Sequence, residues 1–596
     1  MDISNALKYI TRTLPVLVIL FLFSCTGNRE VTTKELQNHI KYLASDSLEG
    51  RMTGSPGDSL AAEYIKNELA SYGFIPLSGD GLQRFKITKK VLPGKANYLS
   101  INEIDYTPEK DFMPLAFSSN SGLESEVIFA GYGFNINGDS LRWNDYNRID
   151  VKGKWVLILR ADPETDNTKS VFIPFSGDRD KALLAKDMGA AGVILVSGPV
   201  FDSQDTFELL GTEGFSVDIP VFRIKREVAD IILSKSKISI ASLEKELNEK
   251  RKPKSFSTNV TINGTSEIIR EMTNTRNVVM MLPGEDEQFK NEYVIFGAHF
   301  DHLGMGGAGS SSRAVDTIGV HHGADDNASG VAMMLELAEK FAGTKGSHKR
   351  SIICIAFTGE EEGLLGSKHF VDDPFIDLTK VNAMINLDMV GRLNETNNLQ
   401  ISGVGTATGL KDLIYSKSDT TLIKLTLSDE GYGPSDHSSF YGKNIPVLFY
   451  FTGAHLDYHT PSDTYDKINY NGMVNISDLI FSVAEELVSS TTRLQFKESG
   501  PKVETARYGR RKGVTLGIMP DFAGNIKNGL RADFVTPGKP AALGGMKKGD
   551  IITAINGKPV NNIQDYMFRM GQLKRGQTIS VEVLRNSKKE VLLIQL

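Results

Sequence analysis

This sequence of 596 residues has only two cysteines and no excess of positive charge. Two cysteines cannot form a disulfide framework, and Cys354, which lies in an apolar run, is predicted to be a core residue. Lysine and arginine total 67 against 73 aspartate and glutamate residues, and the resulting net charge of −6 argues against nucleic acid as a partner. The same charge balance does not suggest a polybasic membrane-binding surface. The length allows roughly three or four domains with sizeable cores.

The first 25 residues combine positive charge with a short apolar run. Lys8 and Arg12 precede the apolar residues 14–23, a run too short to span a membrane as a mature helix. Leu22-Phe-Ser-Cys25 resembles a bacterial lipobox, although its second residue is bulkier than is usual there. We therefore predict a lipoprotein signal peptide over residues 1–25 and a lipid anchor at Cys25, with an ordinary cleaved signal or an uncleaved anchor as alternatives. This prediction places the protein in the bacterial cell envelope, lipid-anchored and periplasmic or at the cell surface.

Residue types that bind metals follow several short apolar runs in the second half of the chain. Residues 293–298 precede His299, residues 352–357 precede Glu360 and Glu361, and residues 383–387 precede Asp388. Runs of this kind are typical of buried strands in an α/β sheet, and ligands of such sheets gather beyond the carboxyl ends of the strands. Two further candidates are Asp326, within residues 323–330, and His459. Repeated placement after strands is hard to attribute to chance, and the pattern predicts a two-metal hydrolase.

The order and combination of these segments resemble the M28 family of zinc aminopeptidases. The resemblance covers residues 36–76 and 270–470, and its matching strings are residues 43–51, 297–302, 323–330, 360–361, 386–389, 435–437 and 458–463. It implies an α/β fold in which a mixed zinc-exopeptidase sheet is flanked by helices. It also implies two zinc ions per chain and no other cofactor.

The resemblance assigns a role to each candidate residue. His299 and Asp388 would hold one zinc ion, Glu361 and His459 the other, and Asp326 would bridge the two. Glu360 would shuttle protons between the attacking water and the leaving amine. Tyr458 would donate a hydrogen bond to the oxyanion, with a packed aromatic ring as the alternative. The peptide bond between Asp326 and Asn327 would be cis, as in relatives.

Other polar residues are expected to support this site. Asp301 is suited to accept the second imidazole N–H of His299 and so to fix its tautomer. Glu362 is predicted to be a surface charge. A supporting role in the cleft wall is expected for His302, His321, His322, Asp436 and His437, while His39, His348, His369 and His455 show no signal above that of surface or core histidines.

Two stretches outside the metal residues have patterns of their own. Residues 154–160, 191–196 and 219–224 are predicted strands and residues 181–189 a helix, and the stretch resembles a PA domain, either a structural lid or a module that positions substrate. The last hundred or so residues resemble a PDZ domain, whose turn at Thr515–Ile518 could accept a peptide C-terminus. The predicted organisation is a signal peptide over 1–25, a peptidase domain split into an N-terminal segment 26–114 and a metal-bearing segment 263–495, a PA insertion over 115–262 and a PDZ domain over 500–596. Neither added module is expected to perform chemistry.

The activity implied by the resemblance is removal of the N-terminal residue from peptides. A carboxypeptidase or dipeptidase on the same scaffold is the alternative, and glutaminyl cyclisation is less favoured because the ligands of the second metal are intact. A receptor-like, inactive relative is disfavoured because Glu360 and all five ligand residues are present. The expected partners are peptide substrates, a peptide C-terminus at the PDZ domain and a membrane through Cys25, but not nucleic acid.

Overall fold

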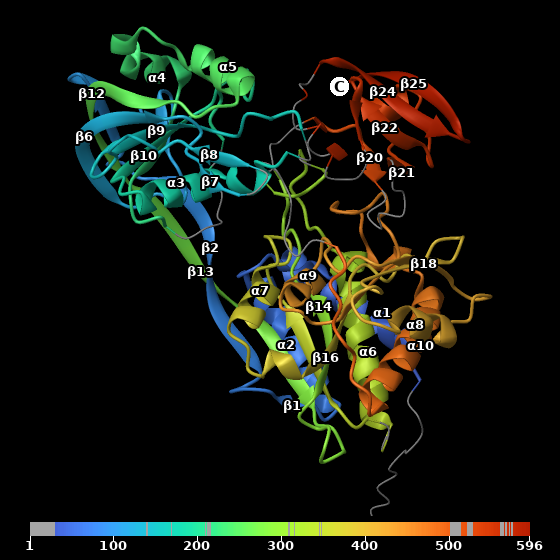
Figure 1. Cartoon of the computed structure of the whole chain (residues 1–596). Helices are drawn as coiled ribbons and strands as arrows, with labels where there is room; N and C mark the ends of the chain where they lie inside the picture. The colour runs from blue at the N-terminus through green and yellow to red at the C-terminus, as the bar shows by residue number, and fades with distance from the viewer. Residues whose placement is uncertain are drawn as a thin grey trace, which may run out of the picture.

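The computed structural model describes residues 30–596 apart from 139–140, 168–169, 209, 211–215, 308–309, 315, 345, 347, 501–513, 521–528, 561–564, 567–568, 571–572 and 574–575. The predicted signal peptide with Cys25 lies outside these residues. Figure 1 shows three bodies, each built around its own sheet. Within the described residues we find no helix with the length and apolar character needed to cross a membrane.

A nine-stranded mixed sheet forms the core of the largest body. Its order is β1-β13-β15-β14-β16-β19-β17-β18, and β2 pairs with β13 outside this order. The four strands β15, β14, β16 and β19 are parallel, whereas β13 and β17 are antiparallel to their neighbours in this group. The strands are β1 (Ile75–Pro76), β2 (Leu82–Pro93), β13 (Ile268–Leu282), β14 (Tyr293–His299), β15 (Ser351–Phe357), β16 (Val381–Leu387), β17 (Asn398–Ser402), β18 (Lys424–Ser428) and β19 (Val447–Phe451).

Helices cover both faces of this sheet. Side chains alternate between the faces along a strand, so that in β14 Phe296 packs into one apolar core and Ile295 into the other. The first core is completed by α1 (Thr33–Leu43), α2 (Pro56–Ser71), α6 (Gly330–Gly343), α8 (Leu410–Lys417) and α10 (Tyr470–Ser489), and the second by α7 (Leu365–Asp372) and α9 (His437–Gly442). The predicted fold, a mixed sheet flanked by helices, is confirmed.

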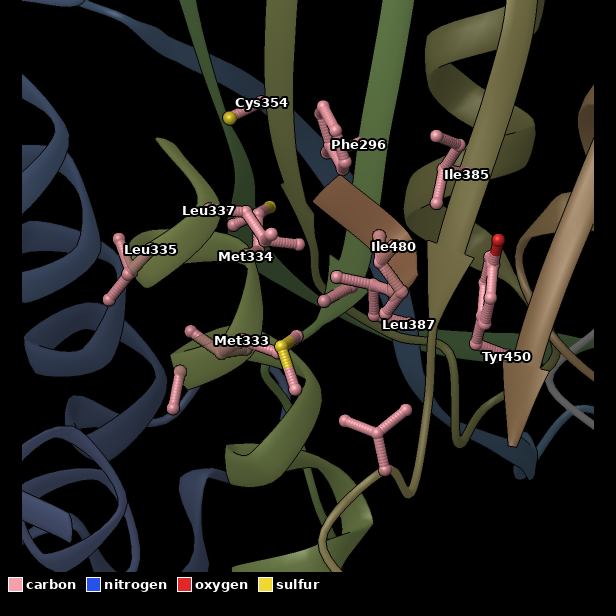
Figure 2. Close-up of a cluster of buried hydrophobic side chains, with 14 of the residues drawn as sticks. Phe296, Met333, Met334, Leu335, Leu337, Cys354, Ile385, Leu387, Tyr450 and Ile480 are labelled. Atoms are coloured by element: carbon pink, nitrogen blue, oxygen red, sulfur yellow. The ribbon is translucent and has the colours of Figure 1, made fainter. Parts of the chain in front are cut away.

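The central strands are buried because both of their faces are covered. Every residue of β15 and β16 is buried. Figure 2 shows Phe296, Ile385 and Leu387 of the sheet beside Met334 and Leu337 of α6. Cys354 lies in the same core with no exposed surface, as predicted. This packing fixes the start of α6 against the carboxyl ends of the strands, where the polar residues gather.

The second body is an eight-stranded sheet in the order β4-β3-β12-β6-β9-β10-β11-β5. The predicted strands and helix in this stretch are confirmed as β9, β10, β11 and α3. The elements are β3 (Tyr98–Ile101), β4 (Ile104–Asp105), β5 (Phe112–Pro114), β6 (Ser121–Ala130), β7 (Asn135–Asn137), β8 (Arg142–Asn144), β9 (Trp155–Leu159), α3 (Asp178–Asp187), β10 (Gly192–Val196), β11 (Val221–Ile224), α4 (Arg226–Ile232), α5 (Ile240–Lys250) and β12 (Ser255–Ser266). The strands β3, β4 and β5 join this sheet although they precede residue 115, and the domain boundaries given above stay predictions.

A two-stranded ribbon connects the second body to the first. β13 pairs with β15 through Val278–Leu282 and with β2 from Ile268 to Val278, so one strand belongs to the large sheet and continues beyond it. Figure 1 shows β2 and β13 rising together from the large sheet toward the second body. The chain therefore leaves and re-enters the first body along neighbouring strands, as an insertion requires.

The third body is a small β-rich domain at the C-terminus. Its strands are β20 (Ile518–Pro520), β21 (Leu530–Val535), β22 (Ile551–Ile555), β23 (Lys558–Pro559), β24 (Thr578–Arg585) and β25 (Lys588–Gln595), with the short helix α11 (Pro540–Leu543). It contacts the second body through Lys558, whose Nζ lies 2.7 Å from Asp166 Oδ1.

Candidate metal centre

The predicted metal residues gather at one edge of the nine-stranded sheet. His299 is the last residue of β14, Asp388 directly follows β16, and Glu361 and His459 lie in the loops after β15 and β19. Asp326 lies in the buried turn Ala324–Ser329, directly before α6. Because the four strands are parallel, their carboxyl ends meet at this edge, and segments far apart in sequence become neighbours.

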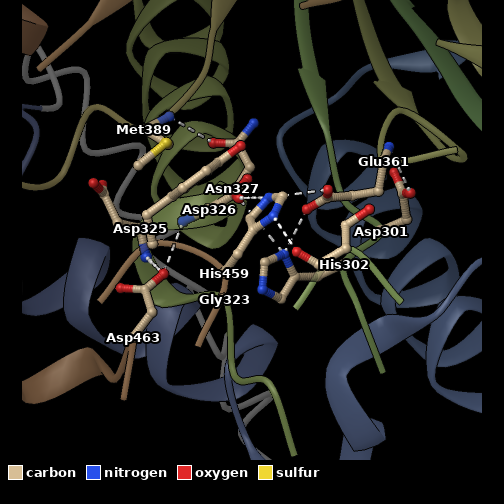
Figure 3. A network of polar contacts seen from close by, with 12 residues as sticks. Asp301, His302, Gly323, Asp325, Asp326, Asn327, Glu361, Met389, His459 and Asp463 are labelled. Carbon is tan, nitrogen blue, oxygen red and sulfur yellow. Dashed lines mark hydrogen bonds and ion pairs between the residues drawn. The ribbon is translucent and has the colours of Figure 1, made fainter. Parts of the chain in front are cut away.

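Asp326 lies between two histidines, one on each side of its carboxylate. Its Oδ1 is 3.3 Å from His299 Nε2, and its Oδ2 is 3.2 Å from His459 Nε2. Asp388 Oδ1 lies 3.4 Å from the same His299 nitrogen, and Glu361 Oε2 lies 3.1 Å from the same His459 nitrogen. The five residues thus form two groups that share Asp326, and Figure 3 shows the group on the His459 side.

Main-chain carbonyls orient both histidines. His299 Nδ1–H donates to the carbonyl of Asp301 at 3.2 Å, and the Asp301 carboxylate is farther away, at 3.6 Å. His459 Nδ1–H donates to the carbonyl of Ser311 at 3.1 Å. Each imidazole therefore presents Nε2 to Asp326, which is the arrangement that a metal ligand needs. The sequence had pointed to the carboxylate of Asp301, but its carbonyl is the nearer acceptor.

The Asp301 carboxylate instead orders the loop that carries the glutamates. It accepts the N–H of Glu360 at 3.1 Å, the N–H of Glu361 at 3.4 Å and the hydroxyl of Thr53 at 3.0 Å. These hydrogen bonds fix the main chain of both glutamates, so their adjacent side chains take different directions from one anchored loop.

Asp388 is held by a short relay of hydrogen bonds. Ser435 Oγ donates to Asp388 Oδ2 at 2.7 Å, and Asn386 Nδ2 donates to Ser435 Oγ at 2.8 Å. Because Oδ2 is engaged by Ser435, Oδ1 is the oxygen directed at His299.

Two imidazoles compete for Glu361. His302 Nδ1 lies 2.8 Å from Glu361 Oε1 but 3.8 Å from Asp326 Oδ2. His459 Nε2 lies within 3.2 Å of one oxygen of each carboxylate. The geometry permits a metal group of His302, Asp326 and Glu361 as well as one of His299, Asp326 and Asp388. The shorter approach to Asp326 favours His459 as the ligand and His302 as a partner that orients Glu361.

The turn that carries Asp326 is clamped from two directions. Asp463 Oδ2 accepts the N–H groups of Asp325 and Asp326 at 2.9 and 3.1 Å. Asn327 donates to the carbonyl of Leu387 at 2.9 Å and accepts the N–H of Met389 at 3.2 Å, so the turn is tied to both sides of Asp388. Figure 3 shows Asp463 beneath Asp325 and Asn327 reaching toward Met389. The Asp326–Asn327 peptide bond is cis, as predicted.

Arg51 has a structural role that the sequence did not reveal. It is 1% exposed and donates to the carbonyls of Phe300 at 2.7 Å, His322 at 2.9 Å and Gly323 at 3.0 Å, and also to the carbonyl of Leu43. Its guanidinium thereby joins the loop after His299 to the segment before Asp326. In the sequence, Arg51 ends the string 43–51 that resembles the family. That resemblance does not indicate which loops the Arg51 side chain joins.

Glu360 and Tyr458 lie beside the two groups of candidate metal ligands. The Glu360 side chain is 13% exposed, and its Oε2 is 4.0 Å from His299 Nε2. Burial, together with the negative charges of Glu361 and Asp388, raises the pKa of Glu360 well above its ordinary value, although His299 opposes this shift. The Tyr458 ring stacks on the His459 ring with 3.8 Å between centroids. Burial and the carboxylates of Asp326 and Glu361 raise the pKa of Tyr458 well above its ordinary value.

The prediction for Glu362 is wrong. This side chain is half-buried, and burial, with a contribution from the Asp301 carboxylate, raises its pKa to about 7. The loop turns sharply at this point, because the Glu360 carbonyl accepts the N–H groups of Gly363 at 2.9 Å and Leu364 at 3.0 Å.

The residues that were predicted to support the site contact residues of the segments around it. His321 Nε2 lies 2.7 Å from Ser312 Oγ, and His322 Nε2 lies 2.9 Å from Asp46 Oδ1. His437 is buried and stacks on Phe449 with 4.5 Å between ring centroids, and Asp436 precedes it in the buried start of α9. His455, for which the sequence showed no signal, has its Nε2 3.1 Å from Asp325 Oδ2. Only the folded chain brings these pairs together.

The site has a surplus of buried negative charge that divalent cations would compensate. Four carboxylates, those of Asp326, Glu360, Glu361 and Asp388, surround two imidazoles. Buried carboxylates are unfavourable unless they are paired or coordinate a metal. Imidazole nitrogen and carboxylate oxygen are also the ligands that zinc prefers. The residues present therefore fit two zinc ions.

Zinc affinity should depend on pH because protons compete with the metal for the same histidines. Burial alone would lower the pKa of both imidazoles, but Asp388 and Glu360 raise that of His299, and Glu361 and Asp326 raise that of His459, well above the ordinary value of 6.5. Protons therefore bind both histidines of the metal-free protein more tightly than they bind an exposed imidazole, and zinc must compete with them. We expect zinc affinity to keep rising as the pH increases past 6.5 and to level off only above the raised pKa values. Competition with a chelator at a series of pH values measures this, and an affinity that is already constant at pH 6.5 would contradict it.

The chain matches three known domain models and several proteins that are named aminopeptidases. Residues 277–484 match the model of peptidase family M28, residues 114–232 that of the PA domain and residues 516–596 that of the PDZ domain. The chain is 26% identical over 396 residues to an aminopeptidase of Bacillus subtilis, covering 65% of this chain and 70% of that protein. It is 25% identical over 532 residues to leucine aminopeptidase 2 of Trichophyton equinum, covering 82% and 92%. It is 24% identical over 380 residues to a probable lipoprotein aminopeptidase of Mycobacterium tuberculosis, covering 62% of each chain.

Proposed function

We propose that this chain, whose catalytic domain belongs to peptidase family M28, is a zinc aminopeptidase that removes the N-terminal residue from peptides. The observation that carries the proposal is the position of Asp326 between His299 and His459, each within 3.3 Å of a different oxygen of its carboxylate. The names of the relatives described above, two of them bacterial aminopeptidases, support the same activity.

Two zinc ions would share the site. His299, Asp326 and Asp388 would hold one, and Asp326, Glu361 and His459 the other. Zinc bound there would polarise the scissile carbonyl and lower the pKa of the attacking water. Ser435, Asp301 and Ser311 would keep the ligand atoms aimed at the ions through the hydrogen bonds already described.

Glu360 would be the general base and then the general acid. It lies beside the ligands without joining either group, and its main chain is held by the Asp301 carboxylate. The raised pKa of Glu360 suits a carboxylate that takes a proton from water and returns one to the leaving amine. The negative charge of the carboxylates at the site would also attract the protonated α-amine of a substrate, which is what an aminopeptidase must recognise.

Tyr458 would donate a hydrogen bond to the oxyanion that forms on the scissile carbonyl. Its raised pKa keeps the phenol protonated at neutral pH, as a donor must be. The alternative is that its ring only packs on His459. The change Tyr458→Phe keeps the ring stack and removes the hydroxyl, so a loss of kcat with unchanged zinc content supports the donor role, and unchanged kcat supports packing alone.

Metal content and substrate choice test the proposed activity together. The purified protein should hold about two zinc ions per chain, since five ligand residues converge in two groups. It should release the first residue of peptides with a free α-amine and leave matched N-acetylated peptides intact. Elemental analysis and a panel of aminoacyl reporters, blocked peptides and C-terminally free peptides measure both. Release of C-terminal residues from the blocked peptides would instead identify a carboxypeptidase.

The remaining predicted partners follow from the added modules and the N-terminus. A peptide C-terminus would bind at the turn Thr515–Ile518 of the PDZ domain, and the PA domain would restrict access or position substrate. A lipid at Cys25 would anchor the enzyme in the bacterial envelope, and one relative is named a probable lipoprotein. Incorporation of a labelled fatty acid that depends on Cys25 tests the anchor.

A further inference from the structure

A short segment far from His459 in sequence holds this residue from both sides. Ser311 accepts the Nδ1–H of His459 at 3.1 Å, and the N–H of Arg313 donates to the His459 carbonyl at 2.9 Å. His459 has φ 57°, in the left-handed region that is unfavourable for residues other than glycine. Its conformation therefore depends on its contacts, and residues 311–313 supply two of them.

The side chain of Arg313 extends this hold along the same loop. Its Nη1 donates to the carbonyls of Leu456 at 3.2 Å and Tyr458 at 3.4 Å. A guanidinium is planar and carries five donors, so it can bind two carbonyls and still direct a donor elsewhere. Through its main chain and side chain together, Arg313 contacts three carbonyls of the loop that ends in His459.

The Nη2 atom of Arg313 reaches a different domain. Its Nη2 donates to Thr536 Oγ1 at 3.3 Å. Thr536 directly follows β21 of the PDZ domain, and its N–H donates to the carbonyl of Gly517 at 2.8 Å. Gly517 lies in the turn Thr515–Ile518. One threonine therefore contacts both this turn of the PDZ domain and the arginine that holds the His459 loop.

The segment itself is well anchored on the peptidase side. Ser312 is 5% exposed, and its Oγ lies 2.7 Å from His321 Nε2 and accepts the N–H of Ala314 at 3.0 Å. The exposed end of the arrangement is the Arg313 side chain, which is where the PDZ domain makes its contact. A change at Thr536 would therefore act on Arg313 and not on the fold of the segment.

We propose that Arg313 is a positioning residue for His459 and that the PDZ domain supports it through Thr536. This inference rests on the proposed function, because His459 matters only if it holds zinc. The PDZ domain then does more than shape access to the site, since it helps to set the geometry of one ligand group while contributing no ligand of its own.

The test compares Arg313→Met, Arg313→Lys and Thr536→Val in the full-length protein. Arg313→Met removes every side-chain donor, and we expect one of two zinc ions to be bound about 10-fold more weakly, as for other residues that orient metal ligands. The value of kcat should fall while KM changes little. Arg313→Lys should recover part of the loss, and Thr536→Val should give a smaller loss in the same direction. The double variant Arg313→Met with Thr536→Val should be no worse than Arg313→Met alone, because both remove one shared contact.

Lys558→Met is the matched control. It removes one of two described contacts between the PDZ domain and Asp166 of the second body, whose carbonyl also accepts a hydrogen bond from Arg569 Nη1 at 3.0 Å, and neither contact involves the His459 loop. Zinc binding and kcat should match those of the original protein. Equal zinc affinity in Arg313→Met and the original protein would overturn the positioning role, and a loss in Arg313→Met with none in Thr536→Val would overturn the PDZ contribution. An equal loss in Lys558→Met would show a general effect of domain docking and would also overturn the proposal. If the original protein binds no zinc, the proposed function itself fails.

Discussion

The change Glu360→Gln is expected to lower kcat by about 10²–10⁴-fold while both zinc ions remain bound, as for removal of a general acid–base. Glutamine has the shape of glutamate but cannot accept a proton from water or return one to the leaving amine. The Glu360 main chain is fixed by the Asp301 carboxylate, and its side chain belongs to neither ligand group, so the metal site should be undisturbed. Elemental analysis and steady-state turnover of an aminoacyl reporter measure the two halves of this prediction.

Glu362→Gln is a close control for this experiment. Glu362 belongs to the same loop, is half-buried and has its pKa raised to about 7. If the loss of a carboxyl group from this loop were enough to lower turnover, both variants would show the loss. We expect near-normal turnover for Glu362→Gln. If Glu360→Gln keeps full turnover, or if both variants lose the same amount, Glu360 is not the base.

The change Asp326→Asn is expected to weaken zinc binding at both positions by more than about 100-fold, the upper range for changes that only orient ligands. Asp326 faces both histidines, with Oδ1 toward His299 and Oδ2 toward His459. Asparagine keeps the size of the side chain but replaces one carboxylate oxygen with an amide and removes the negative charge. Turnover should fall with the zinc content, which chelator competition measures at each position.

Asp325→Asn separates this effect from damage to the turn. The Asp325 carboxylate accepts the N–H of Gly391 at 2.7 Å and faces His455, so it points away from the two ligand groups. The variant should retain both zinc ions. Retention of one tightly bound ion in Asp326→Asn would show that the two positions do not share a ligand, and the bridging arrangement would be wrong.

The sequence by itself determined the class of fold and the residue types of the candidate metal centre. Short apolar runs produced buried strands, and each run was followed by a residue that the strand direction had to place at the same edge of the sheet, as with His299 after β14 and Asp388 after β16. These are local properties, because the strand and the residue that follows it are adjacent in the chain. The resemblance to a family then added the turn of Asp326 and the cis bond at Asp326–Asn327, which the structure contains.

Only the tertiary structure decided how those residues are held. His302 and His459 both face Glu361, and their distances to Asp326, 3.8 and 3.2 Å, separate them. Glu362 is half-buried, which its charged neighbours in sequence do not indicate. The directions of such side chains depend on loops that arrive from distant segments. The hydrogen bonds of Arg51 with Gly323 and of His459 with Ser311 each join residues that are more than a hundred positions apart in the chain. A local sequence pattern cannot predict which carbonyl will accept from a given donor, because that pairing forms only when the strands have packed.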